Sequence, residues 1–188
     1  MLIAAHEFGH SMGFLHETDR LATMNTYYPG AGVLGNNNDP DPHANDVAGD
    51  RFLYGSGGTY HDVAASAYYR DSPGGSFAIP APPLVRRGGY AKLRFTISNR
   101  GTEREDYVLV HFYLSRDRWI DTADTYLGAV AYWMDPGFEG TFTVGLQIPP
   151  SVAPGYYFIG YLLDPYRFIA ETDEDNNGVA YMDWTGIY

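Results

Sequence analysis

Residues 106–115 read DYVLVHFYLS, and they carry the clearest strand signal in the chain. Large apolar side chains recur there at every second position and would share one face of an extended strand: Val108, Val110, Phe112 and Leu114. Residues 90–98 read YAKLRFTIS and alternate in the same way. A strand with one apolar face must bury it against a second layer, so these two segments favour a β-sandwich or barrel.

Several further short segments follow the same pattern on both sides of these two strands. We expect additional strands at residues 61–69, 125–132, 140–148, 155–163, 167–171 and 179–187. Residues 70–83 are rich in Gly and Pro, and they predict a long connection. Seven or more short strands at this spacing indicate an all-β sandwich of immunoglobulin type, which we assign to residues 57–188.

The composition limits the classes of function. The chain has 188 residues, with 45% apolar and 16% aromatic side chains, and its 12 basic and 23 acidic residues give a net charge of −11. Such an acidic surface repels phosphate backbones, so we expect no nucleic acid partner. No apolar run is long enough to predict a membrane span. The absence of cysteine excludes a disulfide scaffold, a cysteine zinc site and a thiol nucleophile.

A histidine motif near the N-terminus predicts a catalytic metal site. The sequence HEFGHSMGFLHE begins at His6 and follows H-E-x-x-H-x-x-G-x-x-H. On a helix, His6 and His10 lie on one face, one turn apart, where both can ligate Zn²⁺. Gly13 allows the helix to end and the chain to turn back, which brings His16 in as a third ligand and leaves a fourth position for water. Glu7 can reach that water as a general base without ligating the metal.

The alternative is a histidine-rich helix whose side chains have unrelated packing roles. A chance match of five fixed positions in this chain has a probability on the order of 10⁻⁵, so we prefer the metal site. The other three histidines have no metal spacing: His43, His61 and His111. We expect surface or hydrogen-bonded structural roles for them.

The motif resembles that of the metzincin zinc endopeptidases, most closely the matrixin branch. Met24, eight residues after the third histidine, matches the methionine turn that this resemblance places beneath the zinc. Tyr28 matches the tyrosine that would help to wall the specificity pocket. Residues 45–55 resemble the final matrixin helix. Two departures exist: Glu17 is more typical of astacins, and Thr26 occupies the position of the tyrosine that ligates zinc in astacins.

The resemblance also implies that part of a catalytic domain lies outside this sequence. In metzincins the substrate-binding sheet precedes the zinc helix, so residues 1–56 correspond to the C-terminal half of a catalytic domain. We therefore expect the true start to lie upstream, together with a signal peptide that this sequence does not contain. The overall fold class is then α+β, with an active-site helix, a methionine turn and a final helix followed by the sandwich.

The second half resembles the CARDB domain, a bacterial sandwich related to cell adhesion. The matching features are Asn99-x-Gly101, Phe112-Tyr113-Leu114-Ser115, Asp124 with Leu127-Gly128, Pro149-Pro150, Pro154-Gly155-Tyr156-Tyr157 and the run ETDEDNN at 171–177. The resemblance implies an accessory domain that mediates binding or acts as a spacer, and that has no catalytic residues.

Calcium is a weaker expectation. Asp173, Asp175 and Asn177 follow the first half of an EF-hand loop, but Trp184 stands where the bidentate glutamate should be. Turn acids explain this segment equally well, and we interpret Asp117, Asp121 and Asp124 as a second solvated turn.

These observations predict a piece of a secreted bacterial zinc endopeptidase that acts on protein or peptide substrates. His6, His10 and His16 would hold Zn²⁺, and Glu7 would take the proton from water and pass it to the leaving amine. The sandwich would bind a cell-surface or extracellular ligand. The alternative is a binding or adhesion module that carries an inactive peptidase remnant.

Overall fold

The computed structural model describes residues 2–16, 24, 46, 49, 57–70 and 76–188. Within these residues the chain forms one helix, α1 (Leu2–Ser11), and eleven strands. The strands are β1 (Val63–Ser66), β2 (Tyr68–Arg70), β3 (Ser76–Ala78), β4 (Leu84–Val85), β5 (Tyr90–Asn99), β6 (Glu105–Ser115), β7 (Thr125–Met134), β8 (Glu139–Gln147), β9 (Gly155–Leu163), β10 (Gly178–Ala180) and β11 (Thr185–Ile187). The described part of the chain is therefore mostly β-structure, and its helix cannot span a membrane.

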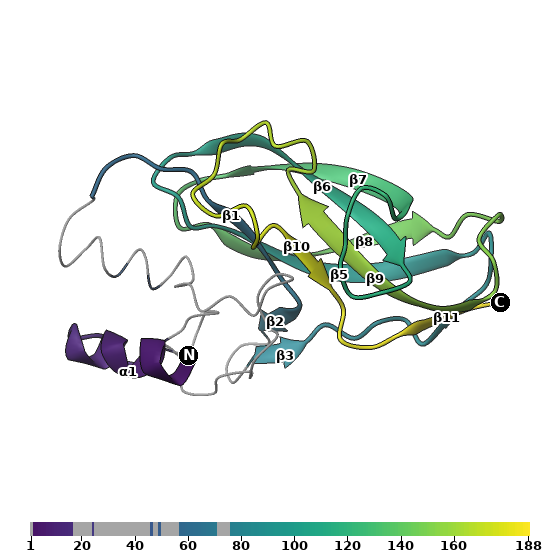
Figure 1. Ribbon diagram of the computed structural model, residues 1–188, viewed down its shortest axis with the longest axis horizontal. Helices are drawn as coiled ribbons and strands as arrows, with labels where there is room; N and C mark the ends of the chain where they lie inside the picture. Colours follow the sequence, from purple (N-terminus) through teal and green to yellow (C-terminus); the bar gives the residue numbers. More distant parts are fainter. Residues whose placement is uncertain (1, 17–23, 25–45, 47–48, 50–56, 71–75) are drawn as a thin grey trace.

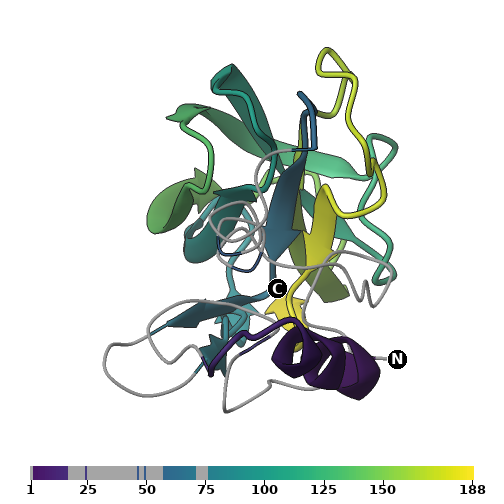
Figure 2. The same ribbon diagram turned by 90° about the vertical axis from the view of Figure 1, so that its left-hand side faces the viewer.

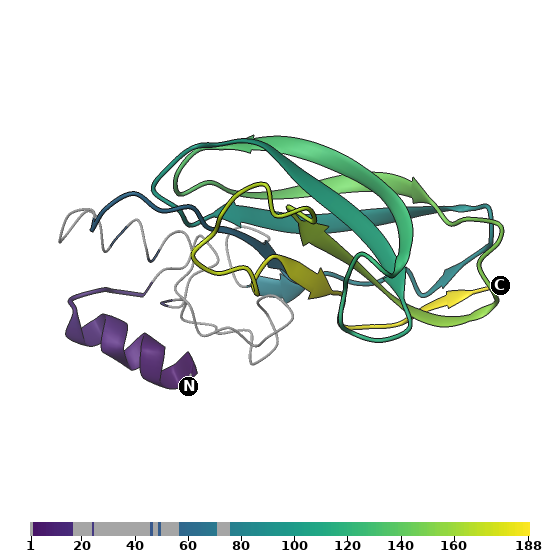
Figure 3. The same ribbon diagram turned by 45° about the horizontal axis from the view of Figure 1, so that its top comes forward.

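The strands form a sandwich of two stacked sheets (Figures 1 and 3). The smaller sheet has the order β1-β5-β8, and the larger has the order β4-β11-β9-β6-β7, with β10 also paired to β9. From β4 onward the chain changes sheets four times, after β4, β5, β7 and β8. Strands β2 and β3 pair separately, and α1 lies outside the two stacked sheets (Figure 2).

The two strands with the strictest sequence alternation build the core. The apolar faces of β5 and β6 are buried and point toward each other, and Phe95 and Phe112 pack edge to face with ring centroids 5.0 Å apart. The strand predictions at 90–98, 106–115, 125–132, 140–148 and 155–163 are confirmed to within two residues at each end. The apolar residues that alternate in β5 and β6 are the ones in the core, although β5, β6 and β9 are buried on both faces along part of their length.

A buried tyrosine ties the two sheets together. Tyr161 on β9 is fully buried, and its Oη lies between β1 and β5 of the opposite sheet. Oη accepts hydrogen bonds from the N–H groups of Ser66 (3.2 Å) and Thr96 (3.1 Å), and it lies 2.7 Å from the Thr96 carbonyl oxygen. Ser66 and Thr96 are partners in the β1–β5 register. The hydroxyl of Tyr161 therefore supplies hydrogen-bond partners to buried backbone groups of both strands.

Three predictions about strands and the connections between them need correction. The expected connection at 70–83 contains β3, a three-residue strand that its Gly- and Pro-rich surroundings conceal. Residues 167–171 are not a strand, because the Asp164 carboxylate accepts the Ile169 N–H (2.7 Å) and bends this segment into a turn. The segment 179–187 is two strands, β10 and β11, since the chain bulges away from β9 between them.

The predicted one-sided burial of the segment 61–69 is also wrong. All four residues of β1 are buried, although only one face was expected to be. β1 pairs with β5 on one edge, and the Ala65 N–H donates to the Asn176 carbonyl oxygen (3.0 Å) on the other. Both edges of β1 are therefore paired, and both of its faces are buried.

The predicted α+β class is supported only in part. α1 is present, and Asp46 and Gly49 have helical backbones within the expected final helix at 45–55. The rest of that helix lies outside the described residues. What the described residues establish is a β-sandwich with one N-terminal helix.

Candidate metal centre

Helix α1 ends in a tight backbone turn at Gly13. Gly13 has φ of +91°, a conformation that side chains other than glycine rarely adopt. The Phe14 N–H donates to the Gly9 carbonyl oxygen (3.0 Å), and the Gly13 N–H donates to that of His10 (3.0 Å). This pair of bonds is the Schellman pattern, so the expectation that the helix ends here and the chain turns back is confirmed.

The turn brings three imidazoles together. His6 and His10 lie one helical turn apart on α1, and His16 reaches them from the segment after Gly13. The His16 Nε2 lies 3.2 Å from the Nε2 of His6 and 3.2 Å from that of His10. One ring nitrogen from each residue lies within 4.8 Å of the other two, so the three can converge on a single ion.

The geometry of the three rings fits a zinc ion. Two nitrogen ligands about 2.0–2.1 Å from a tetrahedral Zn²⁺ are separated by about 3.3 Å, close to the Nε2 separations observed. His10 Nδ1 lies 2.9 Å from the Phe14 carbonyl oxygen, which can only accept a hydrogen bond. Nδ1 therefore carries the proton and Nε2 keeps its lone pair for a metal, the arrangement in which metal-binding histidines are usually oriented.

Glu7 follows His6 on α1, and its side chain is exposed. Its neighbour in sequence, His6, is a member of the cluster, and the ion-ligating group of the described residues does not include the Glu7 carboxylate. The role of Glu7 as a proton carrier therefore stays a prediction from the sequence motif.

Met24 packs directly against α1. Its side chain is buried, and a Cβ added to Gly9 would lie 2.2 Å from the Met24 Sδ, so a larger residue at position 9 would displace the methionine. The Met24 N–H also donates to the buried carboxylate of Asp46 (3.2 Å). Gly9 and Asp46 were not identified from the sequence as partners of Met24, because neither contact has a local sequence signal.

The remaining predicted positions divide into two groups. Tyr28 and His43 lie outside the described residues. His61 pairs with the buried Glu105 through Nδ1, and His111 is buried with Nδ1 3.2 Å from the Tyr113 hydroxyl. Burial also lowers the pKa of His111. Structural roles for His61 and His111 are therefore confirmed.

The segment for which calcium was only a weaker expectation makes contacts of its own. The Asp173 carboxylate accepts the Asp175 N–H (2.8 Å), and Asn177 is buried with its Nδ2 donating to Glu171 (2.7 Å). Within the described part of the chain, the three N-terminal histidines are the only group of three or more ionisable side chains close enough to share an ion. Whether calcium binds at this turn stays a prediction.

Sequence reasoning missed Glu171 as a structural residue. Its carboxylate accepts the Val63 N–H (2.6 Å) and the Asn177 side-chain amide (2.7 Å), so it connects β1 to the segment that leads into β10. Burial is the main cause that raises the pKa of Glu171 to about 8, and the nearby charges of Glu174 and Asp62 raise it further. Its place in an acidic run gave no sign of these two contacts.

Comparisons with known proteins find a different family model for each half of the chain. The Matrixin family model matches residues 1–55, and the CARDB family model matches residues 80–181. A hatching enzyme of Paracentrotus lividus is 52% identical over 54 residues. The match spans 29% of this chain and only 8% of that enzyme.

Solved structures with related folds are distant. One is the CARDB domain of a Pyrococcus furiosus protein in complex with di-metal ions, with a TM-score of 0.48 and 16% identity over 70% of this chain and 97% of that one. Another is a domain of a putative cell surface protein from Methanosarcina acetivorans, with a TM-score of 0.40 and 13% identity over 60% of this chain and 94% of that one. The match of the CARDB model, by contrast, covers more than half of the chain and includes the strands from β4 to β10. The chain therefore belongs to the CARDB family.

Proposed function

We propose that this chain is part of a zinc-dependent endopeptidase, in which the N-terminal segment holds the metal and the CARDB sandwich binds a ligand. The observation that carries the proposal is the convergence of three histidine Nε2 atoms, with separations of 3.2 Å that suit a tetrahedral ion. The Matrixin match over residues 1–55 and the likeness to a hatching enzyme support the same chemistry.

In this proposal, different side chains bind the metal and transfer the proton. His6, His10 and His16 would hold Zn²⁺, which supplies a Lewis acid that makes water nucleophilic at neutral pH and polarises the scissile carbonyl. Glu7 would accept a proton from the attacking water and deliver it to the amine that leaves. Its exposed carboxylate is suited to this task, because no ligand bond of its own restricts it.

Around these residues, two structural features would hold the active geometry. The hydrogen bond from His10 Nδ1 to the Phe14 carbonyl fixes the ring with its Nε2 toward the metal. Met24, buried against Gly9, would support the helix next to the ligands. Tyr28 is proposed as a wall of the specificity pocket from the matrixin resemblance alone.

In this proposal the sandwich acts as the binding module of the same secreted or cell-surface protein. It has a core of its own, and its ligand would be an extracellular protein or cell-surface component. We propose a bacterial, extracellular protein that acts on protein or peptide substrates.

A second candidate is a binding or adhesion module whose peptidase segment is inactive. The specific observation in its favour is the CARDB match, which covers more of the chain than the Matrixin match does. The two candidates differ in one measurable property, namely peptide hydrolysis that depends on bound zinc.

The test separates the metal ligands from the proton carrier. Because the hatching enzyme is far longer than the segment matched here, hydrolysis should be measured in the longest natural chain that contains these residues. Glu7→Gln should keep about one zinc per chain, yet lose about 10²–10⁴-fold in turnover of a fluorogenic peptide. His10→Ala should lose zinc and turnover together.

Glu103→Gln, a change to a carboxylate on the sandwich, is the matched control and should alter neither quantity. Normal turnover by zinc-loaded Glu7→Gln would show that the role assigned to Glu7 is wrong. Zinc-loaded wild-type protein without any hydrolysis would favour the inactive binding module.

A further inference from the structure

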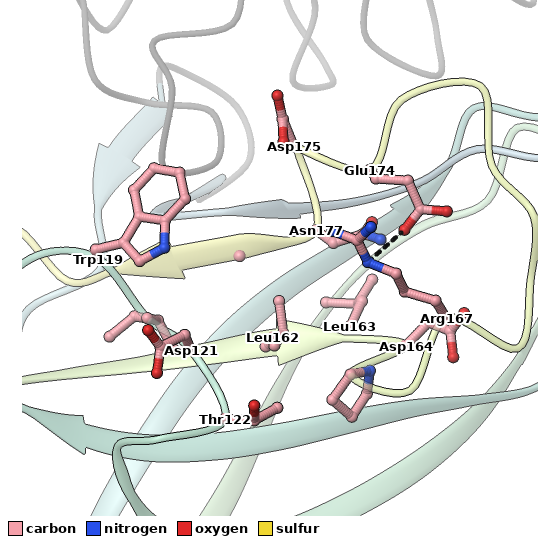
Figure 4. A pocket seen from close by; sticks show the side chains of 13 residues that line it. Trp119, Asp121, Thr122, Leu162, Leu163, Asp164, Arg167, Glu174, Asp175 and Asn177 are labelled. Carbon is pink, nitrogen blue, oxygen red and sulfur yellow. Dashed lines mark ion pairs between the residues drawn. The ribbon is translucent and has the colours of Figure 1, made fainter.

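A pocket opens on the sandwich far from the histidine cluster in sequence. It has a volume of about 210 Å³ and lies between residues 119–122, which follow β6, and residues 164–178, which follow β9 (Figure 4). Ile120 is buried against β9 at Gly160 and anchors the first wall. Leu162 and Leu163 form the floor, with Trp119 and Asp121 on one side and Arg167 and Glu174 on the other (Figure 4).

The ionisable side chains around this pocket are predominantly acidic. Arg167 is the one basic residue among the residues that line it. The lining includes four carboxylates, those of Asp121, Asp164, Glu174 and Asp175. Asp124 lies close in sequence to the pocket residue Asp121, and burial is the main cause that raises its pKa. The negative charges of Asp121 and Asp117 raise the pKa of Asp124 further. The potential at the pocket is therefore negative, and it favours a cationic ligand over a neutral or anionic one.

An aromatic ring on one wall suits the same class of ligand. Trp119 is 51% exposed, and the indole stands at the edge of the pocket (Figure 4). Indole is the aromatic side chain that attracts cations most strongly through its ring face. An alkyl chain that ends in a positive charge could thus contact Trp119 with its methylenes and the carboxylates with its charged end.

The pocket already contains one organic cation of this kind. The Arg167 side chain is 71% exposed, and its Nε lies 3.5 Å from the Glu174 Oε2. Arg167 has φ of +53° and Asp164 has φ of +38°, which makes them two of only three non-glycine residues with positive φ in the described structure. Strained backbone at pocket residues is typical of functional sites.

A buried amide adds an acceptor without a partner. Asn177 lines the pocket and is 3% exposed, and no hydrogen-bond partner of its Oδ1 occurs among the described residues. Its Nδ2 donates to Glu171, which does not line the pocket, so Oδ1 is the end of the amide that is directed toward it. Arg167 and Glu174 line the same pocket as Asn177, so a donor that displaces Arg167 would be a candidate partner for Oδ1.

The spacing of the carboxylates distinguishes an organic cation from a metal ion. Among the described residues, no three acids of this pocket bring ligand atoms within 4.8 Å of one another. Ca²⁺ needs six or more oxygens at short distance, whereas an extended organic cation can use carboxylates that are spread around a wall.

We propose that this pocket binds the ammonium or guanidinium group of a lysine or arginine side chain on another protein. The carboxylates of Asp121, Glu174 and Asp175 would face the charge, and Trp119 would cover the alkyl chain. Arg167 would be displaced from Glu174 as the ligand enters. This inference concerns the sandwich alone and does not depend on the peptidase proposal.

The test is a titration of the 188-residue chain followed by proton–nitrogen NMR. The probe is Nα-acetyl-lysine methylamide, and the matched control is Nα-acetyl-norleucine methylamide, which has a similar chain without the charge. The lysine probe should shift the Trp119 indole signal and the amides of residues 119–122 and 174–178 at millimolar concentrations, and the norleucine probe should not.

Three variants sharpen the expectation. Asp175→Asn should weaken binding of the lysine probe about two- to fivefold, because it removes one partner of the charge. Arg167→Ala should strengthen it by a similar factor, because the competing internal cation is gone. Asp106→Asn removes an exposed carboxylate that pairs with Arg104 elsewhere on the sandwich, and it should change nothing.

Several results would overturn the proposal. These are equal shifts with both probes, an equal loss of binding in Asp106→Asn, or weaker binding in Arg167→Ala. If calcium or a neutral oligosaccharide produced the pattern of shifts while the lysine probe did not, the pocket would be a metal or sugar site instead. Tighter binding of free putrescine than of the lysine probe would indicate a small amine and not a protein side chain.

Discussion

The histidine cluster and the acidic pocket represent two different ways of building a site. The cluster takes its three imidazoles from eleven consecutive residues, His6 to His16, joined by a helix and one glycine turn. The pocket takes its walls from two connections more than forty residues apart, which meet only because β6 and β9 are neighbours in the sheet. A local site can be inferred from spacing in the sequence, whereas a site between loops requires the fold first.

The two regions also differ in what holds them together. The geometry of the cluster depends on a helix end and on the metal that the three rings would share. The sandwich depends on a buried apolar core and on a few buried polar side chains that connect its sheets, above all Tyr161 and Glu171. Variants at these positions should therefore affect one region and spare the other.

The largest change in stability is expected for Tyr161→Phe. Removal of the hydroxyl leaves buried backbone groups of Ser66 and Thr96 without their partner, which should destabilise the sandwich by about 1–3 kcal/mol. Zinc binding by the N-terminal histidines should not change. Urea unfolding followed by tyrosine and tryptophan fluorescence measures the first effect, and calorimetry measures the second.

Tyr157→Phe provides a matched control for this variant. Its hydroxyl makes one hydrogen bond, to the Ala153 carbonyl oxygen (2.9 Å) at the edge of the sandwich, so its loss should cost clearly less. Equal effects of the two variants would mean that Tyr161 does not have the connecting role inferred from its position.

The second prediction concerns the pH dependence of the sandwich. Because the folded state raises the pKa of Glu171 to about 8, the folded protein holds this proton at pH values where the unfolded chain has lost it. The stability of the sandwich should therefore be greatest near or below pH 4.5 as far as Glu171 contributes, and it should fall as the pH rises toward 8. Melting temperatures at pH values from 5 to 9 measure this slope.

Glu171→Gln should flatten the slope, because the variant cannot ionise. Its absolute stability will also change, since an amide cannot accept both hydrogen bonds that the carboxyl group accepts, so only the slope is diagnostic. Asp135→Asn, which alters an exposed acid, should keep the wild-type slope. An unchanged slope in Glu171→Gln would assign the pH dependence to other groups.

The smallest effect is expected for Gly13→Ala. An alanine at φ of +91° is strained by about 1–2 kcal/mol, although nothing lies within 4 Å of the added Cβ. The strain should disturb the helix end and the position of His16, so zinc binding should weaken by up to about tenfold. Gly57→Ala also adds a Cβ in open space, but without positive φ, and should leave zinc affinity unchanged. Equal affinities in all three proteins would show that the turn is not what positions His16.

The strands that sequence reasoning predicted well are those whose pattern has a single physical cause. Leu93 and Phe112 recur in phase with other large apolar side chains because they face the core. In β1 the expectation of one exposed face failed, since Ala64 and Ser66 are buried as well as Val63 and Ala65. At Phe168 and Ile169 an apolar pair suggested a strand, but a hydrogen bond from Ile169 to Asp164 makes a turn.

The candidate sites show the same contrast. Gly13 and the three histidines could be identified because helix geometry relates residues four apart and a helix end relates the next few. The contact of Met24 with Gly9 and the pocket beside Trp119 could not, because they depend on packing between distant segments. Asn177 was noted as a position of a partial EF-hand pattern or of a turn, and its burial follows from contacts that no spacing rule contains.

The central claim is that residues 6–16 form a zinc site, and calorimetric titration of the 188-residue chain with zinc at pH 7 tests it most directly. We expect one zinc per chain in the wild type, and no comparable binding in His10→Ala. His61→Gln should retain full binding, because that ring pairs with Glu105 in the sandwich. A wild-type chain that binds no zinc, or a His10→Ala variant that binds it as well as the wild type, would contradict the account.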